Sequence, residues 1–129
     1  MNKALVIIPT YNEVENIQKI IELTLRVEDF NILVVDDSSP DGTIDVVKGL
    51  VENHPNRIFY VERKSKEGLG KAYIHGFNWA IENKYDFIFE MDADLSHDPK
   101  ELAPMLSYLR EDKDMVIGSR YIKGINVVN

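Results

Sequence analysis

The sequence contains no cysteine. Disulfide frameworks, thiolate metal sites and cysteine nucleophiles are therefore excluded. It also lacks a long apolar run, since the longest, residues 4–9, is far shorter than the ~20 residues needed to span a bilayer. That run is likewise too short for a signal peptide, and residues 10–12 after it do not form a cleavage site. We therefore expect a soluble, cytoplasmic protein.

Basic residues are fewer than acidic residues. The chain has 15 Lys and Arg against 22 Asp and Glu, a formal net charge of −7. Because nucleic-acid binders need a basic face to neutralise phosphates, a nucleic-acid partner is not expected. The 129 residues, 44% hydrophobic and 29% charged, are typical of one soluble globular domain with a core of its own.

Short apolar runs alternate along the chain with helical patterns. Apolar runs predict strands at 4–8, 32–35, 58–61, 87–91 and 115–117. Apolar stripes predict helices within 14–25, 43–51, 73–81 and 99–109. We expect Asn12 to cap the first helix with Glu15 as its capping-box partner, and Asp98 followed by Pro99 to open the last. Pro104 predicts a kink or a loose turn in that last helix.

This alternation predicts an α/β fold, a mostly parallel sheet with helices on both faces. After Gly118 the sequence gives no helix to cover the last strand. We therefore expect residues 1–129 to be the N-terminal portion of a longer protein, forming one domain that is incomplete at its C-terminus.

Polar clusters follow all five predicted strands. In an open parallel sheet, ligands bind beyond the carboxyl ends of the strands. The five clusters are residues 9–13, 36–42, 63–71, 92–94 and 118–120. They are expected to lie at one edge of the sheet, and this convergence is a stronger indication of a site than any single cluster.

Asp92 and Asp94 form the sharpest of these clusters. Residues two apart in extended backbone point to the same side, so both carboxylates can face one point. Hard oxygen ligands suit Mg²⁺ or Mn²⁺, which typically take one or two carboxylates plus substrate phosphates. Ser96 extends the same row as a weak or water-mediated ligand. The alternative is a solvated turn, since Asp and Ser are common turn formers.

Asp37 is the candidate acceptor for a ribose hydroxyl or a base N–H. Adjacent residues at a strand end face opposite ways, so only one of Asp36 and Asp37 can address the ligand edge. Tyr11 is suited to stack on a nucleobase, and Glu13 to accept from its N–H groups. The alternatives are a plain turn at the two aspartates and, for Glu13, a role at the positive end of the helix dipole.

Gly68 and Gly70 precede a predicted helix, where a close backbone approach and the helix N-terminus favour phosphate. The pattern is weak, because such a pair is more often a turn and the lysines around it are equally compatible with a solvated loop. These lysines are Lys64, Lys66 and Lys71. Arg120, after the last predicted strand, is suited to a bidentate contact with a diphosphate.

Taken together and in order, the motifs resemble the N-terminal catalytic part of polyprenyl-phosphate (dolichyl-phosphate) mannose synthases. These are inverting glycosyltransferases of the family-two type with a Rossmann-like GT-A domain. The resemblance is carried by Pro-Thr-Tyr-Asn-Glu at 9–13, Val-Asp-Asp at 35–37, Gly-Leu-Gly-Lys-Ala at 68–72, Met-Asp-Ala-Asp-Leu-Ser-His at 91–97 and Gly-Ser-Arg-Tyr at 118–121.

The resemblance implies site residues position by position. The nucleoside would be held by Pro9, Tyr11, Glu13, Val35 and Asp37. Donor and metal would be bound by Asp92, Ala93 and Asp94. Arg120 would contact the diphosphate and, with Asp94, act in catalysis. Two departures are Ser96, where some relatives carry a Gln metal ligand, and the region near Lys123–Gly124, where a Gly-rich stretch is expected.

The implied activity is metal-dependent, inverting transfer of a hexose to a polyprenyl phosphate. The favoured donor is GDP-mannose and the cofactor Mg²⁺ or Mn²⁺; the lipid acceptor implies the cytoplasmic face of a membrane for the whole protein. One alternative is a relative that uses UDP-glucose or another donor. Others are a receiver-type Mg²⁺-binding signalling domain, a sugar-nucleotide pyrophosphorylase and a non-catalytic nucleotide-binding module.

Overall fold

The computed structural model describes residues 3–27, 29–64, 67–96, 98–112, 115–117 and 126–128. The strands are β1 (Ala4–Thr10), β2 (Asn31–Asp36), β3 (Ile58–Glu62), β4 (Phe87–Glu90), β5 (Met115–Ile117) and β6 (Asn126–Val128). The helices are α1 (Ile17–Val27), α2 (Thr43–Asn53), α3 (Leu69–Glu82), the 3₁₀ turn η1 (Pro99–Glu101) and α4 (Leu102–Asp112).

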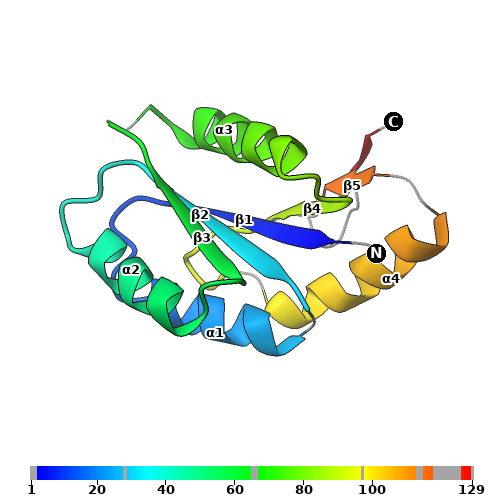
Figure 1. Ribbon diagram of the computed structural model, residues 1–129, viewed down its shortest axis with the longest axis horizontal. Helices are drawn as coiled ribbons and strands as arrows, with labels where there is room; N and C mark the ends of the chain where they lie inside the picture. Colours follow the sequence, from blue (N-terminus) through cyan, green and yellow to red (C-terminus); the bar gives the residue numbers. More distant parts are fainter. Residues whose placement is uncertain are drawn as a thin grey trace.

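Four strands form a parallel sheet in the order β3-β2-β1-β4 (Figure 1). β2 lies beside β1 and β3 beside β2, and the chain then crosses to the other side of β1 to form β4. The strand order therefore reverses at β1. In open sheets of this kind, ligands bind at the carboxyl end of the strands at such a reversal, and this end of β1 lies toward the left of Figure 1. The predicted α/β class and the four matching strands are confirmed.

Helices cover both faces of this sheet, α3 on one and α1, α2 and α4 on the other (Figure 1). Alternate residues of each central strand supply the two cores, since strand side chains point to opposite faces. In β1, Val6 and Ile8 pack in the larger core with α1, α2 and α4. Leu5 and Ile7 pack in the smaller core under α3. Burial on both faces explains why the strands read as continuous apolar runs.

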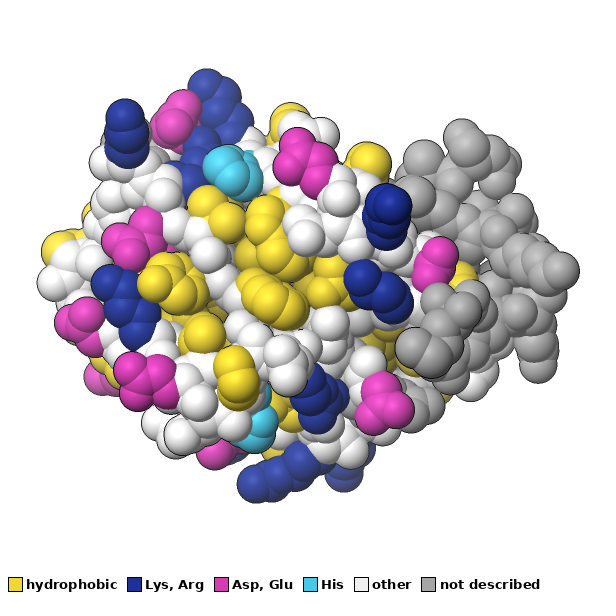
Figure 2. All heavy atoms as spheres, in the orientation of Figure 1, with side chains coloured by type: hydrophobic (Ala, Val, Ile, Leu, Met, Phe, Trp, Pro, Cys, Tyr) yellow, Lys and Arg dark blue, Asp and Glu magenta, His cyan; other side chains and the backbone are white. Residues whose placement is uncertain are grey.

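β3 is one of the two edge strands of this sheet, and its residues are less buried than those of β1 and β2. There Lys48 lies over the ring of Tyr60 and pairs with Glu62 at 3.4 Å. Figure 2 has the orientation of Figure 1 and shows hydrophobic side chains gathered in the middle of the visible surface, with charged side chains around them.

None of the helices in the described ranges combines the length and the apolar character that a membrane span requires.

The structure departs from the predicted elements at the fifth strand. β5 pairs antiparallel with β6 in a separate two-stranded sheet rather than continuing the parallel one. A strand of three residues, as β6 is, carries too little periodicity to be predicted.

The start of the first helix also differs. Asn12 does not cap α1, because its φ of 57° is left-handed and the helix begins only at Ile17. The Glu13 carbonyl instead accepts the first helical hydrogen bonds, from the amides of Asn16 and Ile17. The predicted cap by Asp98 is confirmed, since its carboxylate accepts from the amide of Lys100. Pro104 falls in the first turn of α4, where its missing amide leaves no helical hydrogen bond unmade.

Three non-glycine residues with positive φ lie in the loops after β1, β2 and β4, one in each loop. They are Asn12 at 57°, Ser38 at 58° and Leu95 at 64°. Left-handed backbone is disfavoured for L-residues, most of all for one such as Leu95 whose side chain makes no local hydrogen bond. The loops at the carboxyl edge therefore hold backbone shapes that their sequences do not favour locally.

Gly76 sets the distance between α3 and the sheet. A Cβ at this position would lie 2.7 Å from Cγ2 of Ile7 in β1. We expect Gly76→Ala to lower the free energy of unfolding by about 1–3 kcal/mol, because helix and strand must separate. Urea unfolding measures it. Gly49→Ala in α2, where a Cβ meets nothing within 4 Å, is the matched control and should be neutral or stabilising. Equal stability of the two variants would contradict the close packing.

Candidate functional site

A pocket of about 330 Å³ lies at the carboxyl end of β1. Its residues come from the end of β1 and the loop after it, from the loops that directly follow β2 and β4, and from the start of α3. They are Pro9, Thr10, Tyr11, Glu13, Asp37, Gly68, Ala72, Asp92, Ala93 and Asp94. The pocket therefore sits where the strand order reverses and is within the size range of small-ligand sites.

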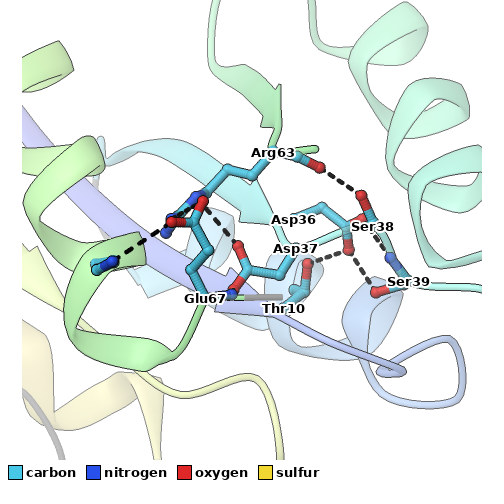
Figure 3. Close-up of polar contacts among 8 residues, drawn as sticks. Thr10, Asp36, Asp37, Ser38, Ser39, Arg63 and Glu67 are labelled. Carbon is cyan, nitrogen blue, oxygen red and sulfur yellow. Dashed lines mark hydrogen bonds and ion pairs between the residues drawn. The ribbon is translucent and has the colours of Figure 1, made fainter. Parts of the chain in front are cut away.

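Asp36 ties the loop after β1 to the loop after β2 (Figure 3). Its buried carboxylate accepts from the hydroxyl of Thr10 at 2.7 Å and from that of Ser39 at 2.6 Å. The Ser39 hydroxyl in turn accepts from the amide of Asn12 at 2.9 Å. Asp36 thus points away from the pocket, as expected when its neighbour Asp37 faces it.

A second link holds Glu13 in place. The Glu13 amide donates to the hydroxyl of Thr43 at 3.0 Å, and that hydroxyl donates to Asp41. Asp41 also accepts from the amide of Val14 at 3.1 Å. Burial would raise the pKa of Asp41, but the hydrogen bonds from Thr43 and Val14 outweigh it and hold the pKa below its ordinary value. The sequence Ser-Pro-Asp-Gly-Thr therefore positions the neighbouring loop.

Asp37 lies at the end of β2 with its carboxylate against Arg63 (Figure 3). Both side chains are more than nine-tenths buried, and Arg63 Nε is 3.4 Å from Asp37 Oδ1. Among the described residues, this Oδ1 has no hydrogen-bond partner. Arg63 also forms an ion pair with Glu67 at 3.0 Å, and Glu67 forms one with Lys71 at 3.5 Å. A buried acceptor oxygen without a hydrogen bond is suited to a donor group on a ligand.

The two aspartates after β4 both line the pocket but differ in their surroundings. Asp92 is half-buried and accepts a hydrogen bond from the hydroxyl of Tyr73 at 2.9 Å. Asp94 is exposed, and its carboxylate accepts from the amide of Ser96 at 3.0 Å. Ala93 between them is buried in the core. Both carboxylates therefore line one pocket, as the sequence predicts, although Ala93 and Asp94 lie in a turn after β4 rather than in the extended backbone that the prediction assumed.

Negative charge is concentrated in this pocket. The pKa of Glu13 is raised above its ordinary value, mainly by burial and also by the carboxylates of Asp94, Asp41 and Asp92, against a hydrogen bond with Asn16. Among the described residues, no three Asp, Glu, His or Cys side chains form a group able to hold a metal ion by themselves. Two carboxylates and phosphate oxygens are a donor set that Mg²⁺ and Mn²⁺ accept, so the residues present fit such an ion.

Not every predicted site residue reaches the pocket. Val35 is fully buried in the core under α3, and Lys71 is exposed and pairs with Glu67. Neither lines the pocket. Arg120 and Lys66 lie outside the described residues.

Arg63 and Tyr73 are two residues that sequence reasoning missed. Arg63 is the first residue of the polar cluster at 63–71, and its position directly after a strand is the signal that could have identified it. Tyr73 was assigned to the apolar stripe of its helix, and nothing local indicates that its hydroxyl meets Asp92, which lies 19 residues away.

The chain belongs to glycosyl transferase family 2, whose model matches residues 5–129. It is 45% identical to polyprenol monophosphomannose synthase of Mycolicibacterium smegmatis and 44% identical to undecaprenyl-phosphate mannosyltransferase of Micrococcus luteus. Dolichol-phosphate mannosyltransferase of Pyrococcus furiosus is 38% identical. Each match covers 98% of this chain and 48%, 52% and 36% of the respective relative, so the chain spans about half or less of their length. The family resemblance found in the sequence is confirmed.

Solved structures agree with this fold. One is the mannosyltransferase PcManGT from Pyrobaculum calidifontis in complex with GDP-Man and Mn²⁺, with a TM-score of 0.66 and 29% identity over 83% of this chain and 32% of that one. Another is S. aureus TarS 1-349, with a TM-score of 0.68 and 25% identity over 88% of this chain and 34% of that one. The predicted glycosyltransferase fold is confirmed.

Proposed function

We propose that the chain is the donor-binding part of an enzyme that transfers mannose from GDP-mannose to a polyprenyl phosphate, using Mg²⁺ or Mn²⁺. The observation that carries the proposal is the convergence of Tyr11, Glu13, Asp37, Asp92 and Asp94 on one pocket. The matches to polyprenyl-phosphate mannosyltransferases and to a mannosyltransferase bound to GDP-Man and Mn²⁺ support it.

In this proposal the pocket divides into a nucleoside end and a diphosphate end. Tyr11 is partly exposed and stacks on the base, while Asp37 and Glu13 accept from hydroxyl or N–H donors of the nucleoside. Pro9 and Ala93 shape the pocket wall. Lys71 and Arg120 supply positive charge toward the diphosphate, and Val35 supports the nucleoside end from within the core.

At the diphosphate end, Asp92 and Asp94 would hold the divalent cation together with the phosphate oxygens. When bound, the cation offsets the charge that develops on the leaving diphosphate. Asp94 and Arg120 are the proposed catalytic residues. A lipid phosphate acceptor is already ionised at neutral pH, so attack needs no general base. Such an acceptor would bring the enzyme to a membrane surface.

The test is a thermal melting panel of the chain with GDP, UDP and dTDP, each with and without Mn²⁺. A ligand at 100 times its Kd stabilises the native state by about 2.7 kcal/mol, which the melting temperature reports. We expect the largest shift with GDP and Mn²⁺. A larger shift with UDP would contradict the GDP-mannose assignment, a possibility raised by the structural likeness to TarS, which has also been solved with UDP. No shift with any nucleotide would contradict the donor-binding role.

A further inference from the structure

The hydroxyl of Tyr73 reaches Asp92 from a different element. Tyr73 lies in the first turns of α3, and its hydroxyl donates to Oδ1 of Asp92 at 2.9 Å. Asp92 follows β4 and lines the pocket. The contact therefore links the helix over one face of the sheet to a carboxylate at its carboxyl edge.

The position of Tyr73 is fixed by packing. Its ring packs against the core under α3, and the preceding Ala72 is buried and also lines the pocket. One turn further on, Gly76 allows α3 to approach Ile7 closely. A ring held in this way delivers its hydroxyl to one place, so the hydrogen bond orients the Asp92 carboxylate rather than following it.

The hydroxyl of Tyr73 places a hydrogen-bond donor on Oδ1 of Asp92. A hydroxyl that donates to a carboxylate oxygen forms a charge-assisted hydrogen bond, and it competes with a cation for the electron pairs of that oxygen. Symmetric binding of one ion by both oxygens is then disfavoured. Mg²⁺ and Mn²⁺ fit near-octahedral sites with single oxygens from each ligand, whereas Ca²⁺ readily takes both oxygens of a carboxylate at longer distance.

We propose that Tyr73 is a positioning residue that presents Asp92 as a one-oxygen ligand, and that it thereby favours Mn²⁺ and Mg²⁺ over Ca²⁺ in the nucleotide complex. The inference rests on the proposed function, because it concerns the cation held with the donor diphosphate. Tyr73 acts through Asp92 and needs no contact with the substrate.

The test compares Tyr73→Phe with the unaltered chain by calorimetric titration of Mn²⁺ and of Ca²⁺ in the presence of GDP. Losing a side chain that orients a metal ligand typically costs about 10–100-fold in metal affinity. We expect Mn²⁺ affinity to fall by about 10-fold and Ca²⁺ affinity to fall less, so that the Mn²⁺ preference shrinks. Affinity for GDP without metal should stay unchanged, which also shows that the pocket remains folded.

Tyr85→Phe is the matched control. Its ring packs against the same core, but its hydroxyl accepts from the Asn31 side chain at 2.7 Å, at the start of β2 and away from the pocket. Both cation affinities should be unchanged in this variant.

The outcomes separate the inference from the proposed function. If the unaltered chain binds GDP with no effect of Mn²⁺, the metal-dependent function itself fails. If Mn²⁺ strengthens GDP binding and Tyr73→Phe keeps the same ratio of Mn²⁺ to Ca²⁺ affinity, the inference is overturned. This includes an equal loss for both cations, which is the result of a merely structural role.

Discussion

Asp94→Asn is expected to remove the gain in GDP affinity that Mn²⁺ provides while leaving metal-free GDP binding almost unchanged. Asp94 is exposed, and an Asn side chain retains an oxygen that accepts from the amide of Ser96, so the loop keeps its shape. Only the negative charge is lost. In the whole enzyme we expect the transfer rate to fall by on the order of 10²–10³, the scale of losing one key electrostatic group at a reacting centre.

Titrating Mn²⁺ at fixed GDP measures the first effect, and a single-turnover assay measures the second. Asp86→Asn is the control, because the Asp86 carboxylate also accepts from a backbone amide, that of Lys3, at the opposite end of the sheet. That variant should behave as the unaltered chain. Unchanged Mn²⁺ dependence in Asp94→Asn would contradict the assignment of Asp94 as a metal ligand.

Arg63→Met is expected to produce the largest loss of stability. The side chains of Arg63 and Asp37 are only 8% and 7% exposed, so removing the guanidinium leaves a buried carboxylate without its ion pair. Breaking a buried pair on one side typically costs about 3–5 kcal/mol. Unfolding in guanidinium chloride at neutral pH measures this loss of stability. Lys48→Met, which breaks the exposed pair with Glu62, should change stability very little.

The double variant Arg63→Met with Asp37→Asn identifies the cause of that loss. Because the double variant has no unpaired charge, we expect it to recover much of the stability lost in Arg63→Met. Its GDP affinity should be low, because the Asp37 carboxylate is absent. If Arg63→Met were as stable as the unaltered chain, the ion pair would not hold Asp37 in place. If the double variant were no more stable than Arg63→Met, lost packing of the long side chain would be the cause.

The sequence contains enough local information to predict β1 to β4 and most of the pocket. Burial on both faces makes each strand a continuous apolar run. Asp92 and Asp94 both line the pocket, as predicted, but through a turn after β4 rather than through strand alternation. Asp37 faces the pocket and Asp36 turns away, as strand geometry requires. Their roles toward a ligand stay predictions.

Contacts between distant segments explain what the sequence could not predict. Asn12 reads as a cap, yet its amide donates to Ser39, 27 residues away, and its backbone is left-handed. Asp37 pairs with Arg63, and Asp92 accepts a hydrogen bond from Tyr73. These pairs form only when the assembled sheet brings their segments together. No periodicity in the chain records such pairings.

The left-handed residues Asn12, Ser38 and Leu95 bear on the thermodynamics of ligand capture. Backbone held in sparsely populated regions persists only where the surrounding fold over-determines it. The free-energy cost of shaping these three loops therefore arises during folding. Under the proposed function, a nucleotide that enters the pocket does not have to order them. Preorganisation of this kind raises affinity by reducing the entropy lost on association rather than by adding contacts.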